Sequence, residues 1–145
     1  MYKIQTQVSF EAAHRLYNVN TYSEECRKNI HGHSYKVTVV VCRPELNDAG
    51  MVMDFKKLKK IIKEEIEDVY DHGCVLKYDD PLVNAVSTSC AKLVVSNVSP
   101  TAEWMSQQFY KQLSDALKKE DAALAVEYVA VQETEHNIAI YEPEV

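Results

Sequence analysis

The fold is decided by the stretch HGHSYKVTVVVC, residues 31–42, in which an alternating apolar run follows a His-x-His motif. Its apolar residues occupy every second position from Tyr35 to Val41, a spacing typical of a strand with one buried face. His31 and His33 stand at the entrance of this strand, so their imidazole rings point to the same face. Gly32 has no side chain that could crowd an ion held between the two rings.

Three other segments show the same alternation and predict the remaining strands. Ile4 to Phe10 alternate with polar residues and lead directly into Glu11–His14. Residues 124–130 and 138–141 form two shorter runs near the end of the sequence. Together with the central stretch, these segments predict four strands.

Two amphipathic helices are predicted between the second and third strands. Asp54 is a suitable N-cap for the first helix, whose apolar residues recur at helical spacing as far as Tyr70. The second helix is expected to begin at Ser99-Pro100, with proline at the first helical position. Its apolar stripe comprises Met105, Phe109, Leu113 and Leu117. Two helices on one face of a four-stranded antiparallel sheet, in the order ββααββ, define an α+β fold.

Two segments between these elements lack a clear repeating pattern. Residues 17–30 are polar and predict an irregular loop, and residues 74–98 give the weakest basis in the chain for assigning secondary structure. Within the second segment, Asp79-Asp80-Pro81 signals a turn and residues 93–95 predict a short extended piece.

The second face of the sheet is not expected to be solvated. Val40, Val129 and Val131 lie out of phase with the positions assigned to the core. Apolar residues on that face suggest that another subunit buries it, so a homo-oligomer is expected.

Length and composition limit the classes of function. The 145 residues, 46% hydrophobic and 26% charged, predict one domain spanning residues 1–145. The formal net charge of −6 argues against nucleic acid as a partner. No apolar run approaches the ~20 residues that span a bilayer, and residues 1–5 lack the apolar core of a signal peptide. We therefore expect a cytoplasmic protein without a membrane partner.

The histidines predict a zinc site. His14, at the end of the first strand, is the candidate third ligand beside His31 and His33. Neutral imidazole is the commonest metal ligand, and three protein ligands with one open position are typical of catalytic zinc. Cys26 is a candidate fourth ligand, and with it the site would be closed and structural.

Three further polar features are candidate functional groups. Cys26 lies beside Arg27 and Lys28, whose charge favours a thiolate, so it is either a nucleophile or general base, or an inert loop thiol. Asp71-His72 can form a carboxylate–imidazole pair for proton transfer, or simply a polar helix terminus. Glu133 can bind paired N–H donors of a guanidine-like ring edge, or lie exposed at a strand end.

Six segments, in order, together resemble the 6-pyruvoyl-tetrahydropterin synthase / 6-carboxytetrahydropterin synthase family. They are Phe10–Arg15, Cys26–Tyr35, Gly50–Phe55, Asp71-His72, Pro100–Glu103 and Glu133–Tyr141. The resemblance implies the tunnelling fold, in which subunits form a barrel, usually a hexamer made of two trimers. It also implies that active sites lie at subunit interfaces, so that Asp71 and His72 serve the zinc site of a neighbour.

The resemblance also implies roles for individual residues. The implied zinc ligands are His14, His31 and His33; the implied catalytic residues are Cys26, Asp71 and His72; the implied substrate-binding residues are Glu133 and Thr101. Cys26 corresponds to the general base, and Asp71 with His72 to its proton relay. Glu133 corresponds to the anchor of the pterin ring, and Thr101 to a residue lining the pterin pocket.

The reaction that the resemblance implies is a zinc-dependent lyase reaction on 7,8-dihydroneopterin triphosphate. We expect 6-carboxy-5,6,7,8-tetrahydropterin, acetaldehyde and triphosphate as products, on the route to queuosine and other deazapurines. The alternatives are a 6-pyruvoyl-tetrahydropterin synthase, which keeps the side chain, and a non-catalytic pterin-binding protein with structural zinc. Four residues separate Cys26 from His31, a spacing between those typical of the two branches. Glu24 and Glu25 are alternative bases, since some relatives use glutamate.

Overall fold

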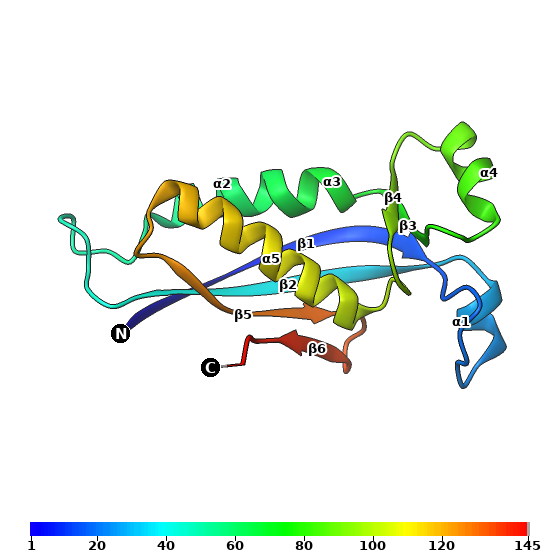
Figure 1. Ribbon diagram of the computed structural model, residues 1–145, viewed down its shortest axis with the longest axis horizontal. Coiled ribbons are helices and arrows are strands. Elements are labelled where there is room, and N and C mark those ends of the chain that lie inside the picture. Colours follow the sequence, from blue (N-terminus) through cyan, green and yellow to red (C-terminus); the bar gives the residue numbers. More distant parts are fainter. Residues whose placement is uncertain (145) are drawn as a thin grey trace.

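A mixed sheet with helices packed on one face forms the body of the protein in the computed structural model, which describes residues 1–144 (Figure 1). The strands are β1 Tyr2–His14, β2 His31–Arg43, β3 Gly73–Lys77, β4 Leu93–Ser96, β5 Ala125–Gln132 and β6 Ile138–Tyr141. The helices are α1 Glu24–Lys28, α2 Phe55–Ile62, a π-helical turn Lys63–Glu67, α3 Asp68–Tyr70, α4 Leu82–Ser89 and α5 Ala102–Glu120.

The sheet has six strands in the order β4-β3-β1-β2-β5-β6, so the expectation of four strands is wrong. The four expected strands are present and pair antiparallel with one another, but β3 pairs parallel with the end of β1 and β4 pairs parallel with β3. Residues 73–76 of β3 are all buried, on both faces of the sheet. The sequence of β3 is therefore a continuous apolar run without the alternation that marks a half-exposed strand. The α+β class is confirmed, with a mixed sheet in place of an antiparallel one.

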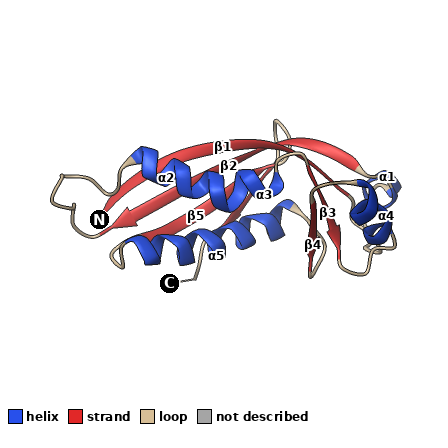
Figure 2. Ribbon diagram, turned by 90° about the horizontal axis from the view of Figure 1, so that it is seen from above, coloured by secondary structure: helices blue, strands red, loops and turns tan. Residues whose placement is uncertain are grey.

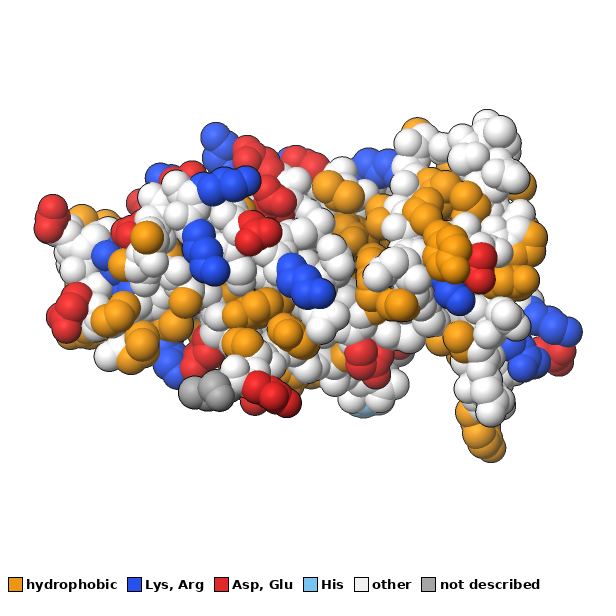
Figure 3. Space-filling view, in the orientation of Figure 1, with side chains coloured by type: hydrophobic (Ala, Val, Ile, Leu, Met, Phe, Trp, Pro, Cys, Tyr) orange, Lys and Arg blue, Asp and Glu red, His pale blue; other side chains and the backbone are white. Residues whose placement is uncertain are grey.

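The helical segment after β2 and the helix α5 lie side by side over one face of the sheet (Figure 2). Asp54 caps α2 as expected, accepting hydrogen bonds from the backbone N–H groups of Lys56 and Lys57. The predicted stripe of α5 is fully buried. Their outer surfaces carry interspersed basic and acidic side chains (Figure 3). No helix within residues 1–144 is long and apolar enough to cross a membrane.

The helix α5 begins later than the sequence predicted. Thr101, not Ser99, is its N-cap, and the Thr101 hydroxyl accepts a hydrogen bond from the backbone N–H of Trp104. Pro100 therefore precedes the helix, and its carbonyl oxygen is free to accept a bond from elsewhere in the fold.

The expectation that Val129 and Val131 lie on the sheet face away from the core is wrong, because the pairing of β5 with β2 is irregular. The register shifts between Val40 and Val41, which turns Val129 and Val131 toward the helices, where both are fully buried. Val40 is 5% exposed within a single chain. These valines therefore give no support to a second subunit, and the oligomer stays a prediction.

Candidate functional site

Three histidines converge where β1 ends and β2 begins. His14 pairs with His31 across the two antiparallel strands, and His33 pairs with Ala12 two residues away, so all three rings share one face of the sheet. One ligand atom from each ring lies within 4.8 Å of the other two. His14 is 1% exposed, while His31 and His33 are half-buried.

Hydrogen bonds to backbone carbonyls orient the rings of His14 and His31 through their Nδ1 atoms, which leaves Nε2 of each ring for the cluster. Nδ1 of His14 lies 2.8 Å from the carbonyl oxygen of Pro100, and Nδ1 of His31 lies 2.9 Å from that of Asn29. A carbonyl oxygen only accepts, so each Nδ1 carries the proton and each neutral ring keeps a lone pair on Nε2. Burial lowers the pKa of His14 to about 4, which keeps its ring neutral at pH 7.

The carboxylate of Glu133, just beyond β5, faces two of these rings. Its Oε1 lies 3.4 Å from Nε2 of His14 and 3.5 Å from Nε2 of His33. Since Nε2 of His14 has a lone pair and no proton, it cannot donate a hydrogen bond to this oxygen. Imidazole lone pairs facing a carboxylate oxygen are the donor set of a cation, and three imidazoles suit zinc.

A hollow of about 600 Å³ opens beside Glu133, over the strands β1 and β2 and the end of β5. His33, Ser34 and Lys36 from β2 line it together with the segment 132–135. A ligand in this hollow could therefore meet the Glu133 carboxylate and His33 at once.

Cys26 lies on the short helix α1 and is half-buried. Ser23 caps this helix, and its hydroxyl accepts a hydrogen bond from the backbone N–H of Cys26. Within residues 1–144, the side chains grouped closely enough to hold a metal are the three histidines, without Cys26. This placement argues against Cys26 as a fourth ligand.

Asp71 and His72 follow α3 and are held against β1 by the backbone of Glu11. Asp71 Oδ1 accepts from the Glu11 N–H at 2.9 Å, and the His72 N–H donates to the Glu11 carbonyl at 2.6 Å. Asp71 Oδ2 lies 2.9 Å from Nδ1 of His72. The bonds from the Glu11 N–H and from His72 lower the pKa of Asp71. The imidazole is thereby oriented with its Nε2 toward solvent.

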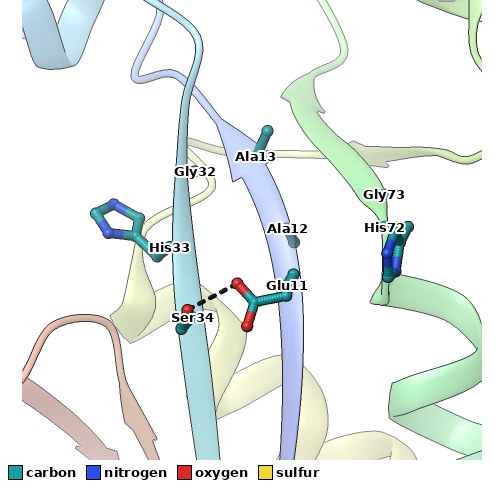
Figure 4. Close-up of a pocket in the computed structure, with 8 residues that line it drawn as sticks. All are labelled: Glu11, Ala12, Ala13, Gly32, His33, Ser34, His72 and Gly73. Atoms are coloured by element: carbon teal, nitrogen blue, oxygen red, sulfur yellow. Dashed lines mark hydrogen bonds between the residues drawn. The ribbon is translucent and has the colours of Figure 1, made fainter.

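The structure places His72 outside the histidine cluster. A hollow of about 350 Å³ is lined by Ala12, His33 and His72, but the His33 ring lies beyond β2 and points away from His72 (Figure 4). The His72 ring is 80% exposed. Its backbone has a φ of +61°, a left-handed conformation that non-glycine residues rarely adopt. Strain of this kind is kept where the surrounding structure holds it, as the bonds to Glu11 do here.

Gly73 allows this strained turn to pack against the end of α3. A Cβ atom at position 73 would lie 2.8 Å from the carbonyl oxygen of Tyr70, whereas one at Gly32 would meet nothing closer than 3.5 Å. Gly73→Ala is therefore expected to lower the free energy of unfolding by about 1–3 kcal/mol in urea titrations. Gly32→Ala is the matched control, and an equal loss in both variants would contradict this packing argument.

Two groups near the histidines were not anticipated from the sequence. The Pro100 carbonyl orients His14, and no local pattern identifies such a backbone partner across 86 positions. Arg15, adjacent to His14, forms an ion pair with the buried Asp80. The Asp79-Asp80-Pro81 turn signal marked the position of this acid but not its partner.

The structure is thus an α+β fold in which three histidines that could hold a metal ion face a carboxylate where β1 ends. Comparison with known proteins gives the family. A family model described as 6-pyruvoyl tetrahydropterin synthase matches residues 3–144. The chain belongs to this family.

Curated relatives carry the names of both family reactions. A 6-carboxy-5,6,7,8-tetrahydropterin synthase of Aquifex aeolicus is 32% identical, over 90% of this chain and 89% of the relative. A 6-pyruvoyl tetrahydrobiopterin synthase of Homo sapiens is 33% identical, over 98% of this chain and 92% of the relative.

Solved structures have the same fold. The 6-pyruvoyl tetrahydropterin synthase of Caenorhabditis elegans has a TM-score of 0.69 and 26% identity, over 99% of this chain and 96% of that one. An uncharacterized protein of Wolinella succinogenes has a TM-score of 0.83 and 24% identity, over 99% and 98% of the two chains, and shows the fold alone.

Proposed function

We propose that this protein is a zinc-dependent lyase that converts 7,8-dihydroneopterin triphosphate and one water molecule to 6-carboxy-5,6,7,8-tetrahydropterin, acetaldehyde and triphosphate. The observation that carries the proposal is the histidine cluster facing the Glu133 carboxylate. The family membership supports pterin chemistry, and the Aquifex relative supports the carboxy-forming branch. A role in the queuosine and deazapurine route and a cytoplasmic location belong to the same proposal.

The three Nε2 atoms of His14, His31 and His33 would hold the zinc ion. When bound, zinc acts as a Lewis acid toward the side-chain oxygens of the substrate. The Glu133 carboxylate binds the amino and N–H groups of the pterin ring, which places the side chain of the substrate at the histidine end of the hollow. Thr101, the N-cap of α5, lines a separate hollow of about 440 Å³ and not the one beside Glu133, so its contact with the pterin stays a prediction.

Proton transfer is assigned to Cys26 and to the Asp71–His72 pair. The Cys26 thiolate removes a carbon-bound proton of the substrate side chain. His72 Nε2, held outward by the bond of its Nδ1 to Asp71, donates or accepts the second proton of the tautomerisation. Glu24 and Glu25, exposed on the same helix, are the alternative bases.

A hexamer built from two trimers is also part of the proposal. β6 is an edge strand, and Ile138 and Ile140 on it are 57% and 63% exposed. Exposed apolar residues on an unpaired edge support pairing with another subunit. In such an assembly the exposed His72 ring would face the zinc site of a neighbour.

The 6-pyruvoyl-tetrahydropterin synthase reaction is the second candidate, favoured by the similarity to the human enzyme. It eliminates triphosphate and keeps the three-carbon side chain, whereas the first reaction also breaks a carbon–carbon bond. Incubating the zinc-loaded protein with 7,8-dihydroneopterin triphosphate is expected to yield a carboxypterin with an equal amount of acetaldehyde by mass spectrometry. A pyruvoylpterin without acetaldehyde would establish the second reaction instead.

A non-catalytic pterin-binding protein with structural zinc is the candidate from another class. It requires Cys26 as the fourth zinc ligand, which the position of Cys26 outside the histidine group opposes. Absence of any product in the same incubation, together with pterin binding, would favour it.

A further inference from the structure

Asp80 is a buried acid in the segment that links β3 to α4, and the proposed mechanism does not use it. Its side chain is completely buried. Oδ2 accepts a hydrogen bond from Nε of Arg15 at 2.7 Å, and Oδ1 accepts from Nη2 of Arg15 and from the backbone N–H of Leu82 at 2.8 Å. Burial alone would raise the pKa of Asp80, but these bonds outweigh it and lower the pKa.

The two hydrogen bonds to Asp80 fix the orientation of the Arg15 guanidinium, which also donates a hydrogen bond to the helix α1. Its Nη1 donates a hydrogen bond of 3.0 Å to the carbonyl oxygen of Lys28, the last residue of α1. A planar guanidinium held on one side by a carboxylate presents its remaining N–H groups at fixed positions. Asp80 therefore determines, through Arg15, where the C-terminal end of α1 is held.

The helix α1 needs such a contact because it has little else to hold it. It is five residues long and has no buried residue, and isolated helices of this length are unstable in water. Within residues 1–144, two further bonds hold it: the backbone bond from Leu16 N–H to the Cys26 carbonyl, 2.9 Å long, and the bond from Nδ1 of His31 to the carbonyl of its C-cap Asn29. The bonds from Arg15 and Leu16 come from the two residues after His14, the most deeply buried histidine of the cluster.

We propose that the Asp80–Arg15 pair is a positioning device that holds α1, and with it Cys26, in place relative to the histidine cluster. This inference rests on the proposed role of Cys26 as the base. It gives a function to the β3–α4 segment, which lies beside α1 at one end of the molecule (Figure 1). Asp80 and Arg15 are positioning residues and need not touch the substrate.

Asp80→Asn tests the proposal, with Asp121→Asn as the matched control. Arg43 pairs with Asp121 at 3.2 Å and also donates to a carbonyl oxygen, that of Val52. The side chains of Arg43 and Arg15 are 12% and 13% exposed. The two arginines thus match in burial and in having a carbonyl partner, whereas Asp121 is 42% exposed and Asp80 is completely buried, and only Arg15 contacts α1.

Three measurements on the zinc-loaded proteins are expected to agree. In Asp80→Asn, the backbone amides of Leu16, Cys26 and Asn29 should lose protection from hydrogen exchange. Alkylation of Cys26 by iodoacetamide should become faster relative to that of Cys42. Misplacement of the base should lower kcat by about 10–100-fold, with KM and zinc content unchanged. Asp121→Asn should show none of these changes.

Two results would overturn the proposal. Equal behaviour of Asp80→Asn and Asp121→Asn would show that the pair does not hold α1. Loss of zinc from Asp80→Asn would show that the pair acts on the ligand strand instead. The hydrogen-exchange and alkylation measurements need no turnover. They therefore test whether the Asp80–Arg15 pair holds α1 even if the protein proves not to be a lyase.

Removing one charge of a buried pair can prevent folding, because the other charge stays buried without a partner. The double variant Arg15→Gln/Asp80→Asn removes both charges and provides the second test. It is expected to fold, to retain zinc and to show the same loss of protection at α1 and the same fall in kcat. Wild-type protection in this folded variant would equally overturn the proposal.

Discussion

Replacing Cys26 by alanine is expected to leave the zinc content unchanged and to lower kcat by about 10²–10⁴-fold. The reason is geometric: the metal-binding group consists of three histidine side chains, and Cys26 lies outside it. Loss of the thiolate therefore removes the base without removing a ligand. Zinc content measured by elemental mass spectrometry, together with steady-state kinetics on the pterin triphosphate, checks both parts.

His31→Ala is the variant to compare with Cys26→Ala. It removes one of three ligands, so both zinc and activity are expected to be lost. Loss of zinc from Cys26→Ala would contradict the prediction and make the site a closed structural one. Retention of activity in Cys26→Ala would transfer the role of base to another group, and Glu24→Gln and Glu25→Gln would then identify it.

The central part of the fold follows from short-range patterns in the sequence. Alternation along residues 4–10 and 35–42 identified the two long strands, and helical spacing identified the helices on the covered face. These patterns are reliable where a strand or helix has one buried and one exposed side. They fail for β3, which is buried on both sides and has no alternation to detect.

Departures from regular structure account for the other differences. The register shift beside Val40 reverses which residues of β5 face the core, and a single irregularity of this kind is invisible in the sequence. The helix α1 does carry signals, with Ser23 as its cap, acidic residues first and basic residues last. It was expected as a loop because five residues are too few to show a helical period.

The candidate site was predictable to the extent that its residues lie close in sequence or share a strand face. His31 and His33 are two residues apart, and pairing of the two long strands brings His14 opposite them. The contact of Glu133 with two histidines depends on where β5 ends, which local patterns do not determine. The Arg15–Asp80 pair joins positions 65 residues apart, and only the packing of the β3–α4 segment reveals it.

The remaining large effect is expected at Glu133. Glu133→Ala should weaken binding of the pterin by about 10²-fold or more, because two charge-assisted hydrogen bonds of about 1.5–3 kcal/mol each are lost. Zinc content should be unchanged, since the three imidazoles form the ligand set. Glu45→Ala is the control, because Glu45 is exposed and lies outside the residues that line the hollow. Calorimetric titration with a non-reacting pterin gives the affinity.

The position of Glu133 makes this experiment decisive between two roles. Its Oε1 lies within 3.5 Å of Nε2 of both His14 and His33, close enough to raise the question of a fourth zinc ligand. A ligand role predicts weaker zinc binding in Glu133→Ala, whereas an anchor role predicts weaker pterin binding alone. Glu133→Gln sharpens the distinction: the amide keeps the size of the side chain but loses its charge and turns one acceptor into a donor. Pterin affinity should therefore fall nearly as far as in Glu133→Ala, and an affinity equal to that of the unaltered protein would remove Glu133 from the anchor role.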